Sequence, residues 1–136
     1  MTRMTFAIIT DIHSNNVSLK KAISIISDRK NIDQIICLGD CFPLGPSPND
    51  TLKTLSSLTN CVFIRGNHDR YILERLWKVD SPSLEGMNPD DPICQDIVAN
   101  IEWTSKQLGK KGYDFLKKMQ TSHRVQVKNT IIEFTH

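Results

Sequence analysis

Short apolar runs alternate with helix-like segments through the first half of this 136-residue chain. Apolar residues dominate 4–10, 34–38 and 61–64, and each run ends at a polar cluster or a glycine, as buried parallel strands do. Between these runs, leucine, isoleucine and alanine recur at helical spacing in 19–26 and 52–58. The order strand, helix, strand, helix, strand predicts an α/β fold with a parallel sheet and helices packed on it.

The second half of the chain has a looser pattern. Residues 80–92 contain prolines and a glycine, which predicts a loop that covers or borders a site. Apolar residues at helical spacing predict an amphipathic helix over 93–108 and a shorter helix over 113–119. Residues 124–127 and 130–134 are predicted to form two strands joined by a turn.

Composition excludes several classes of protein. With 39% hydrophobic and 24% charged residues, the chain is typical of a globular domain. Its net charge of +2 is too small to indicate a nucleic-acid partner or an anionic membrane. No apolar run approaches the roughly 20 residues of a membrane span, and the N-terminus lacks the pattern of a signal peptide, so we expect a cytoplasmic protein. The four cysteines form no CxxC pair and are expected to be ordinary thiols, and no pattern indicates an oligomeric state.

Three polar clusters follow the three predicted strands: Asp11-Ile12-His13, Gly39-Asp40 and Gly66-Asn67-His68-Asp69. Each one alone also fits a helix cap, a turn or a solvated histidine. Because the carboxyl ends of parallel strands meet at one edge, we expect the clusters to form one patch of carboxylates, imidazoles and an amide. Such a patch repels itself unless a cation neutralises it. Ligands of this kind, without thiolates, favour Mn, Fe or Zn over calcium or a structural cysteine site.

The segments DIH, GDCFPLGPSP and GNHD, in this order, resemble the motifs of the calcineurin-like metallophosphoesterase superfamily. GPSPND and IEWTSKQL are similar to its small bacterial and archaeal phosphodiesterase branch. The resemblance implies an α/β sandwich with a βαβαβ core and flanking helices. It also implies that residues 1–136 are the N-terminal part of a longer metallophosphoesterase domain. The missing portion of the sheet would carry a GHxH motif beyond His136.

The same resemblance implies a centre with two divalent metal ions, Mn²⁺ first, with Fe, Zn or Ni as alternatives. Its implied ligands are Asp11 and His13 for one ion, Asn67 and His136 for the other, and Asp40 as a bridge between them. His68 would be catalytic, next to the leaving group, and Asp69 would orient it by accepting a hydrogen bond.

The implied function is hydrolysis of small phosphodiesters or phosphomonoesters by a metal-bound hydroxide. An alternative is a catalytically impaired family member that acts as a protein-interaction scaffold. A nucleotide-binding domain is disfavoured because residues 10–16 contain no glycine. Leu44-Gly45 stands where the protein-phosphatase and diadenosine-tetraphosphatase branches have Arg-Gly, which makes those activities less expected. Arg65 is a candidate substitute for the missing phosphate-binding arginine.

Overall fold

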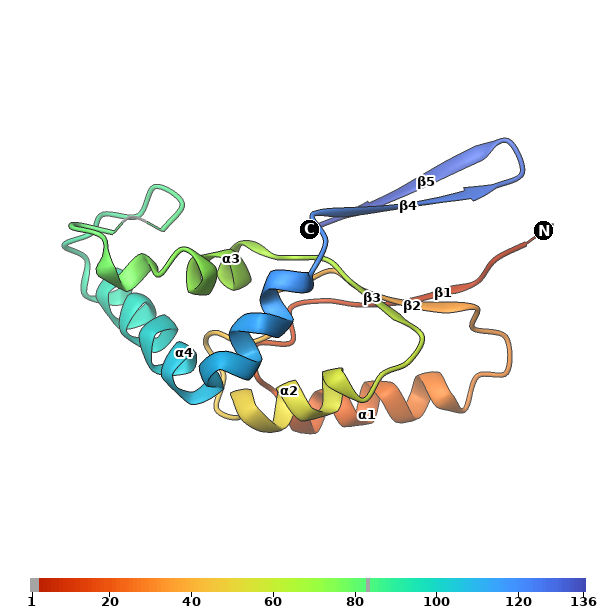
Figure 1. Ribbon diagram of the computed structural model, residues 1–136, viewed down its shortest axis with the longest axis horizontal. Helices are drawn as coiled ribbons and strands as arrows, with labels where there is room; N and C mark the ends of the chain where they lie inside the picture. The colour runs from red at the N-terminus through yellow and green to blue at the C-terminus, as the bar shows by residue number, and fades with distance from the viewer. Residues whose placement is uncertain (1–2, 83) are drawn as a thin grey trace.

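A computed structural model describes residues 3–82 and 84–136. Its central sheet is parallel, with the strand order β1-β2-β3. These strands are β1 (Phe6–Ile9), β2 (Gln34–Cys37) and β3 (Cys61–Phe63), and the helices that connect them are α1 (Asn16–Ser27) and α2 (Pro48–Ser56). Both helices lie on the same face of the sheet (Figure 1), as right-handed crossovers require. The predicted βαβαβ core is confirmed.

The helix-facing side of the sheet is filled by large apolar side chains. Phe42, Leu55, Ile101 and Leu116 are fully buried in one cluster with Cys37. Each of the large side chains contributes about 1.5–3 kcal/mol through its removal from water. This cluster fixes the helices against the sheet, and the loops at the carboxyl ends of the strands are held with them.

A hairpin covers the opposite face of the sheet. It consists of β4 (Ser122–Val127) and β5 (Thr130–Thr135), which pair in antiparallel register as predicted. Ile36, Ile64 and Phe134 are buried between the sheet and the hairpin. The molecule is therefore a sandwich of hairpin, parallel sheet and helices (Figure 1).

The remaining helices connect the sheet to the hairpin. They are α3 (Asn67–Leu73), the short 3₁₀ helix η1 (Leu76–Lys78) and α4 (Pro92–Lys118), and α4 packs against both α2 and α3. Gly109 breaks α4 with a φ of 57° and a ψ of −153°, so the two predicted helical segments are confirmed as two arms of one element. The buried face of α4 begins at Cys94, which is 1% exposed, whereas Ile93 is 62% exposed.

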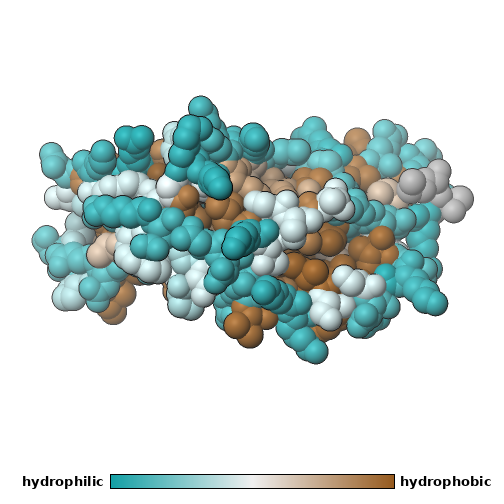
Figure 2. Space-filling view, turned by 60° about the horizontal axis from the view of Figure 1, so that its bottom comes forward, coloured by the Kyte–Doolittle hydropathy of each residue, from teal (hydrophilic) through white to brown (hydrophobic). Residues whose placement is uncertain are grey.

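The surface combines a polar periphery with apolar patches, which Figure 2 shows toward the middle and right of one face. Ile8 on β1 and Val17 on α1 are among the exposed large apolar residues. Ile8 also lines a cavity of about 400 Å³ that opens between β1 and α1. Within residues 3–82 and 84–136, no helix is both long and apolar enough to span a membrane.

Candidate metal centre

The loops that follow β1 and β2 are bound to each other through their backbones. The N–H of Asp11 donates to the carbonyl of Gly39 at 3.0 Å, and the N–H of His13 donates to the carbonyl of Asp40 at 2.9 Å. Asp11, His13 and Asp40 all have a positive φ, between 46° and 53°. A residue held in this left-handed backbone conformation costs about 1–3 kcal/mol, and such residues are concentrated at functional sites. The sequence therefore maintains a strained arrangement that brings these three side chains together.

Two glycines let the loops after β2 and β3 approach closely. A Cβ on Gly39 would lie 2.3 Å from the backbone nitrogen of Gly66, and Gly39 has a φ of +102°. A Cβ on Gly66 would lie 2.1 Å from Oδ1 of Asp40. Because no side chain fits at either position, the glycines of the GD and GNHD segments are required by the geometry of the site.

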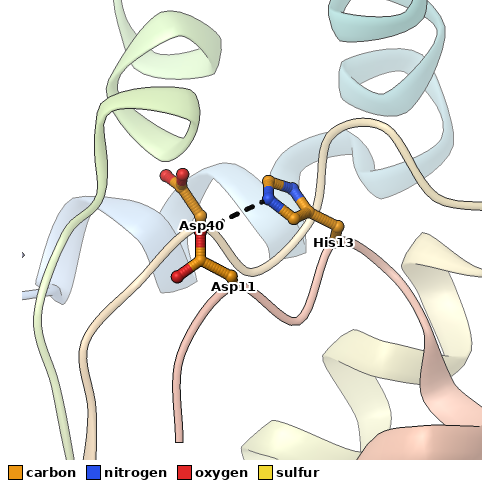
Figure 3. A group of neighbouring side chains, drawn as sticks. All are labelled: Asp11, His13 and Asp40. Atoms are coloured by element: carbon orange, nitrogen blue, oxygen red, sulfur yellow. Dashed lines mark ion pairs between the residues drawn. The ribbon is translucent and has the colours of Figure 1, made fainter.

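Asp11, His13 and Asp40 form a compact ligand group, in which one ligand atom from each lies within 4.8 Å of the others. In Figure 3 the imidazole of His13 points toward the two carboxylates. Nδ1 of His13 lies 2.8 Å from the carbonyl of Pro43, and its Nε2 lies 3.6 Å from Oδ1 of Asp11. When Nδ1 donates to the carbonyl, Nε2 presents its lone pair to the site, as in a metal-binding histidine.

A second pair of predicted ligands, Asn67 at the start of α3 and His136 after β5, lies next to Asp40. Nε2 of His136 lies 2.9 Å from Oδ1 of Asn67 and 3.5 Å from Oδ2 of Asp40. Nδ1 of His136 lies 2.7 Å from the carbonyl of Leu38, so this ring is held in the same way as that of His13. The other four predicted ligands therefore lie around Asp40, and the donor atoms of the group fit divalent transition-metal ions.

Asp69 does not have the predicted contact with His68. Its carboxylate is fully buried and accepts hydrogen bonds from the backbone N–H groups of Asp40 at 2.8 Å, Cys41 at 2.9 Å and Gly66 at 3.0 Å. In the described part of the chain, no hydrogen bond joins Asp69 to the His68 ring. The predicted orienting role is therefore wrong, and Asp69 instead fixes the loops after β2 and β3. Burial raises the pKa of Asp69 to about 6.

His68 lies between the metal-ligand group and the core. Its ring centroid is 5.4 Å from that of His13 and 5.3 Å from that of Tyr71, edge-on to both. Its backbone N–H donates to Oδ1 of Asp40 at 3.0 Å, while its Nδ1 is buried without a hydrogen-bond partner among the described residues. Burial lowers the pKa of His68, and the charge of Asp40 partly opposes that shift. The imidazole is therefore favoured in its neutral form, which can still donate one hydrogen bond.

Two further residues have contacts that the sequence did not reveal. The carboxylate of Glu85, in the predicted loop over 80–92, accepts a hydrogen bond from Nδ2 of Asn67, which confirms that this loop borders the site. The opposite end of the same amide, Oδ1, then faces His136. Arg65 donates from Nη2 to the carbonyls of residues 116, 117 and 119, so its guanidinium secures the end of α4.

Replacing Glu85 with alanine is expected to weaken metal binding by Asn67 and His136 about tenfold, as loss of a residue that orients a ligand typically does. Without this acceptor, the amide of Asn67 can rotate and present its NH₂ group to the ion. Manganese titration followed by electron paramagnetic resonance would measure both sites. Asp80→Ala, in the same loop, is the matched control, and an equal loss in both variants would contradict the orienting role.

Comparison with known proteins points to one family. A family model described as calcineurin-like phosphoesterase matches residues 4–131. Over all 136 residues, the chain is 30% identical to an uncharacterized protein of Methanocaldococcus jannaschii, and it covers 50% of that protein. The chain thus spans about half the length of the relative that it matches.

Solved structures show the same fold. A hypothetical protein of Pyrococcus horikoshii OT3 superposes with a TM-score of 0.71 at 22% identity, over 96% of this chain and 54% of its own. A metallophosphoesterase of Sphaerobacter thermophilus superposes with a TM-score of 0.57 at 28% sequence identity. The match covers 92% of this chain and 44% of that protein. A putative diadenosine tetraphosphatase superposes with a TM-score of 0.66 at 17% sequence identity, over 97% of this chain and 51% of that protein. At this identity the match supports the fold alone. With its three motifs gathered at one edge of the sheet, the chain belongs to the calcineurin-like phosphoesterase family.

Proposed function

We propose that the protein hydrolyses phosphate esters with the help of two divalent metal ions. The observation that carries this proposal is the position of Asp40, whose carboxylate lies between two pairs of ligand side chains. One pair is Asp11 and His13, and the other is Asn67 and His136. A carboxylate in that position suits a ligand shared by two ions.

The charges around Asp40 support the same proposal. Asp11, Asp40 and Asp69 gather at this edge of the sheet, and no lysine or arginine forms an ion pair with them in the described ranges. Such a group of carboxylates is stabilised by cations. Carboxylate, imidazole and amide oxygen together suit Mn²⁺, which we propose as the metal, with Fe, Zn and Ni as alternatives. When bound, two such ions supply a hydroxide nucleophile and neutralise charge on the phosphate.

The protein's own side chains orient the ligands and serve the leaving group. Backbone carbonyls hold the rings of His13 and His136 with Nε2 toward the site. His68 is proposed to donate a hydrogen bond to the departing oxygen, since its neutral ring lies beside His13. The scaffold alternative is not favoured, because the structure brings the predicted ligands together around one carboxylate. Diesters and monoesters both remain within the proposal.

Turnover of bis-p-nitrophenyl phosphate tests this function. The Mn²⁺-loaded protein is expected to release nitrophenol, the EDTA-treated protein to release none, and added Mn²⁺ to restore the rate. His68→Ala is expected to lower turnover roughly 10²–10³-fold, the usual loss when one hydrogen-bond donor to a developing negative charge is removed. Its metal content should be unchanged, because His68 is not one of the proposed ligands. Absorbance at the nitrophenolate band measures the rates on nitrophenyl esters, and chromatography of the released alcohol measures those on alkyl esters.

The matched control is His123→Ala, which changes a histidine on β4 that packs against Phe134. The loss in His68→Ala should be smaller for nitrophenyl esters than for alkyl esters, since nitrophenolate leaves without assistance. Equal losses on both kinds of ester would contradict the role in leaving-group departure. Absence of metal-dependent turnover in folded wild-type protein would overturn the proposed function itself.

A further inference from the structure

A cavity of about 300 Å³, lined by polar and charged residues, adjoins the proposed ligands of the second metal ion. Its lining includes Asn67 and His136, and four further side chains: Arg65, Arg70, Thr121 and Thr135. No leucine, isoleucine, valine, methionine or aromatic residue contributes to it. By contrast, the cavities at β1–α1 and at α2–α4 have leucines in their walls. The side chains of this cavity offer guanidinium, amide, hydroxyl and imidazole groups, which suit a ligand with several hydrogen-bond acceptors.

The cavity carries positive charge from two arginines. Arg65 is fixed in place, because Nη2 donates to three carbonyls at the end of α4 at 3.2–3.3 Å. Its Nε is buried and has no hydrogen-bond partner among the described residues. No aspartate or glutamate contributes to the lining. Glu85 reaches Asn67 but does not line the cavity, so an anion there would meet a cationic surface.

Arg70 is the more exposed of the two arginines and is the one that can reach a ligand. It projects from α3, one turn after Asn67, and its side chain is 56% exposed. Among the described residues, its Nε pairs with the carboxylate of Glu74 at 3.5 Å, and its guanidinium carbon lies 5.9 Å from the ring centroid of Tyr71. Exposed pairs of this kind contribute little to stability, so a phosphate can replace the partner at small cost. Arginine is also the residue that best matches two oxygens of a phosphate.

We propose that this cavity binds a second phosphate group of the substrate, carried next to the scissile ester, and that Arg70 recognises it. The inference rests on the proposed phosphoesterase function. Asn67 and His136 take part in both the ligand group and the cavity wall, so a scissile phosphate at the metal ions would have the cavity as its neighbour. The threonine hydroxyls can donate to the remaining oxygens of the second phosphate. The substrate class is therefore a phosphate ester with two neighbouring phosphate groups.

Calorimetric binding of phosphonates to the Mn²⁺-loaded full chain tests this inference, at constant free Mn²⁺. Methylphosphonate is the probe with one anionic group. Bisphosphonates with methylene spacers of increasing length carry a second anionic group at increasing distance from the first. At least one bisphosphonate should bind about tenfold more tightly than methylphosphonate, as expected for a charge-assisted arginine contact. Arg70→Gln should remove that advantage and leave methylphosphonate binding unchanged. Arg70→Lys should restore part of it.

Arg75→Gln is the matched control, since Arg75 lies after the last turn of α3 and does not line the cavity. The inference is overturned when no bisphosphonate binds better than methylphosphonate. It is also overturned when Arg70→Gln weakens both kinds of ligand equally, or when Arg75→Gln has the same effect. Turnover of bis-p-nitrophenyl phosphate is measured on the same samples. Loss of turnover with an Arg70-dependent preference for bisphosphonates would reject the proposed function and retain the anion site.

Discussion

Replacing Asp40 with asparagine is expected to abolish phosphoester hydrolysis while the chain remains folded. The amide has the shape of the carboxylate but not its charge. Only its oxygen can bind a cation, because its NH₂ group is a hydrogen-bond donor. Asp40 also has a φ of 53°, a conformation that asparagine adopts more readily than most residues. The substitution therefore isolates the loss of charge from backbone strain, which an alanine variant would add.

Three measurements on Asp40→Asn check this expectation. Elemental analysis should show loss of the two-ion state, turnover of bis-p-nitrophenyl phosphate should fall to the uncatalysed background, and circular dichroism should be that of the wild type. Asp33→Asn, at an exposed position before β2, is the control and should keep its metal content. Two ions per chain in folded Asp40→Asn would rule out the bridging role.

The parallel sheet could be predicted because its signals are local. The apolar runs before Asp11, Gly39 and Gly66 correspond to β1, β2 and β3, and each is long enough for only one buried strand. The convergence of the polar clusters then follows from topology, since parallel strands end at the same edge. Only His136 could not be placed from these signals. The resemblance to the family supplied its predicted role, and the hairpin pairing in the structure brings it to Leu38.

The contacts of individual side chains could not be predicted from the residue order. The resemblance implied that Asp69 orients His68, yet Asp69 is the third residue of α3. A carboxylate at that helical position reaches back to the N–H before the helix, here that of Gly66. Recognising the helix start would have corrected this role. Glu85 gave no such signal, because its approach to Asn67 depends on the path of an irregular loop.

Replacing Asp69 with alanine is expected to lower the free energy of unfolding by several kcal/mol. Three backbone N–H groups, those of Asp40, Cys41 and Gly66, would lose their acceptor in a region where Asp69 is fully buried. A buried donor without a partner costs about 1–3 kcal/mol, so three of them remove much of the roughly 5–15 kcal/mol of a typical domain. Part of this cost is offset because the buried carboxylate is itself unfavourable when ionised, as its raised pKa indicates.

Urea unfolding followed by circular dichroism measures the change, and a graded pair of variants makes the test specific. Asp69→Asn keeps one carbonyl oxygen and turns an NH₂ group toward the remaining amide, so its stability should fall between those of the alanine variant and the wild type. Asp114→Ala, which removes an exposed partner of Lys110 on α4, should unfold as the wild type does. Metal affinity should fall together with stability, because the same three bonds position Asp40. Wild-type stability in Asp69→Ala would mean that water or another group satisfies these amides, and Asp69 would then not be the residue that joins the two loops.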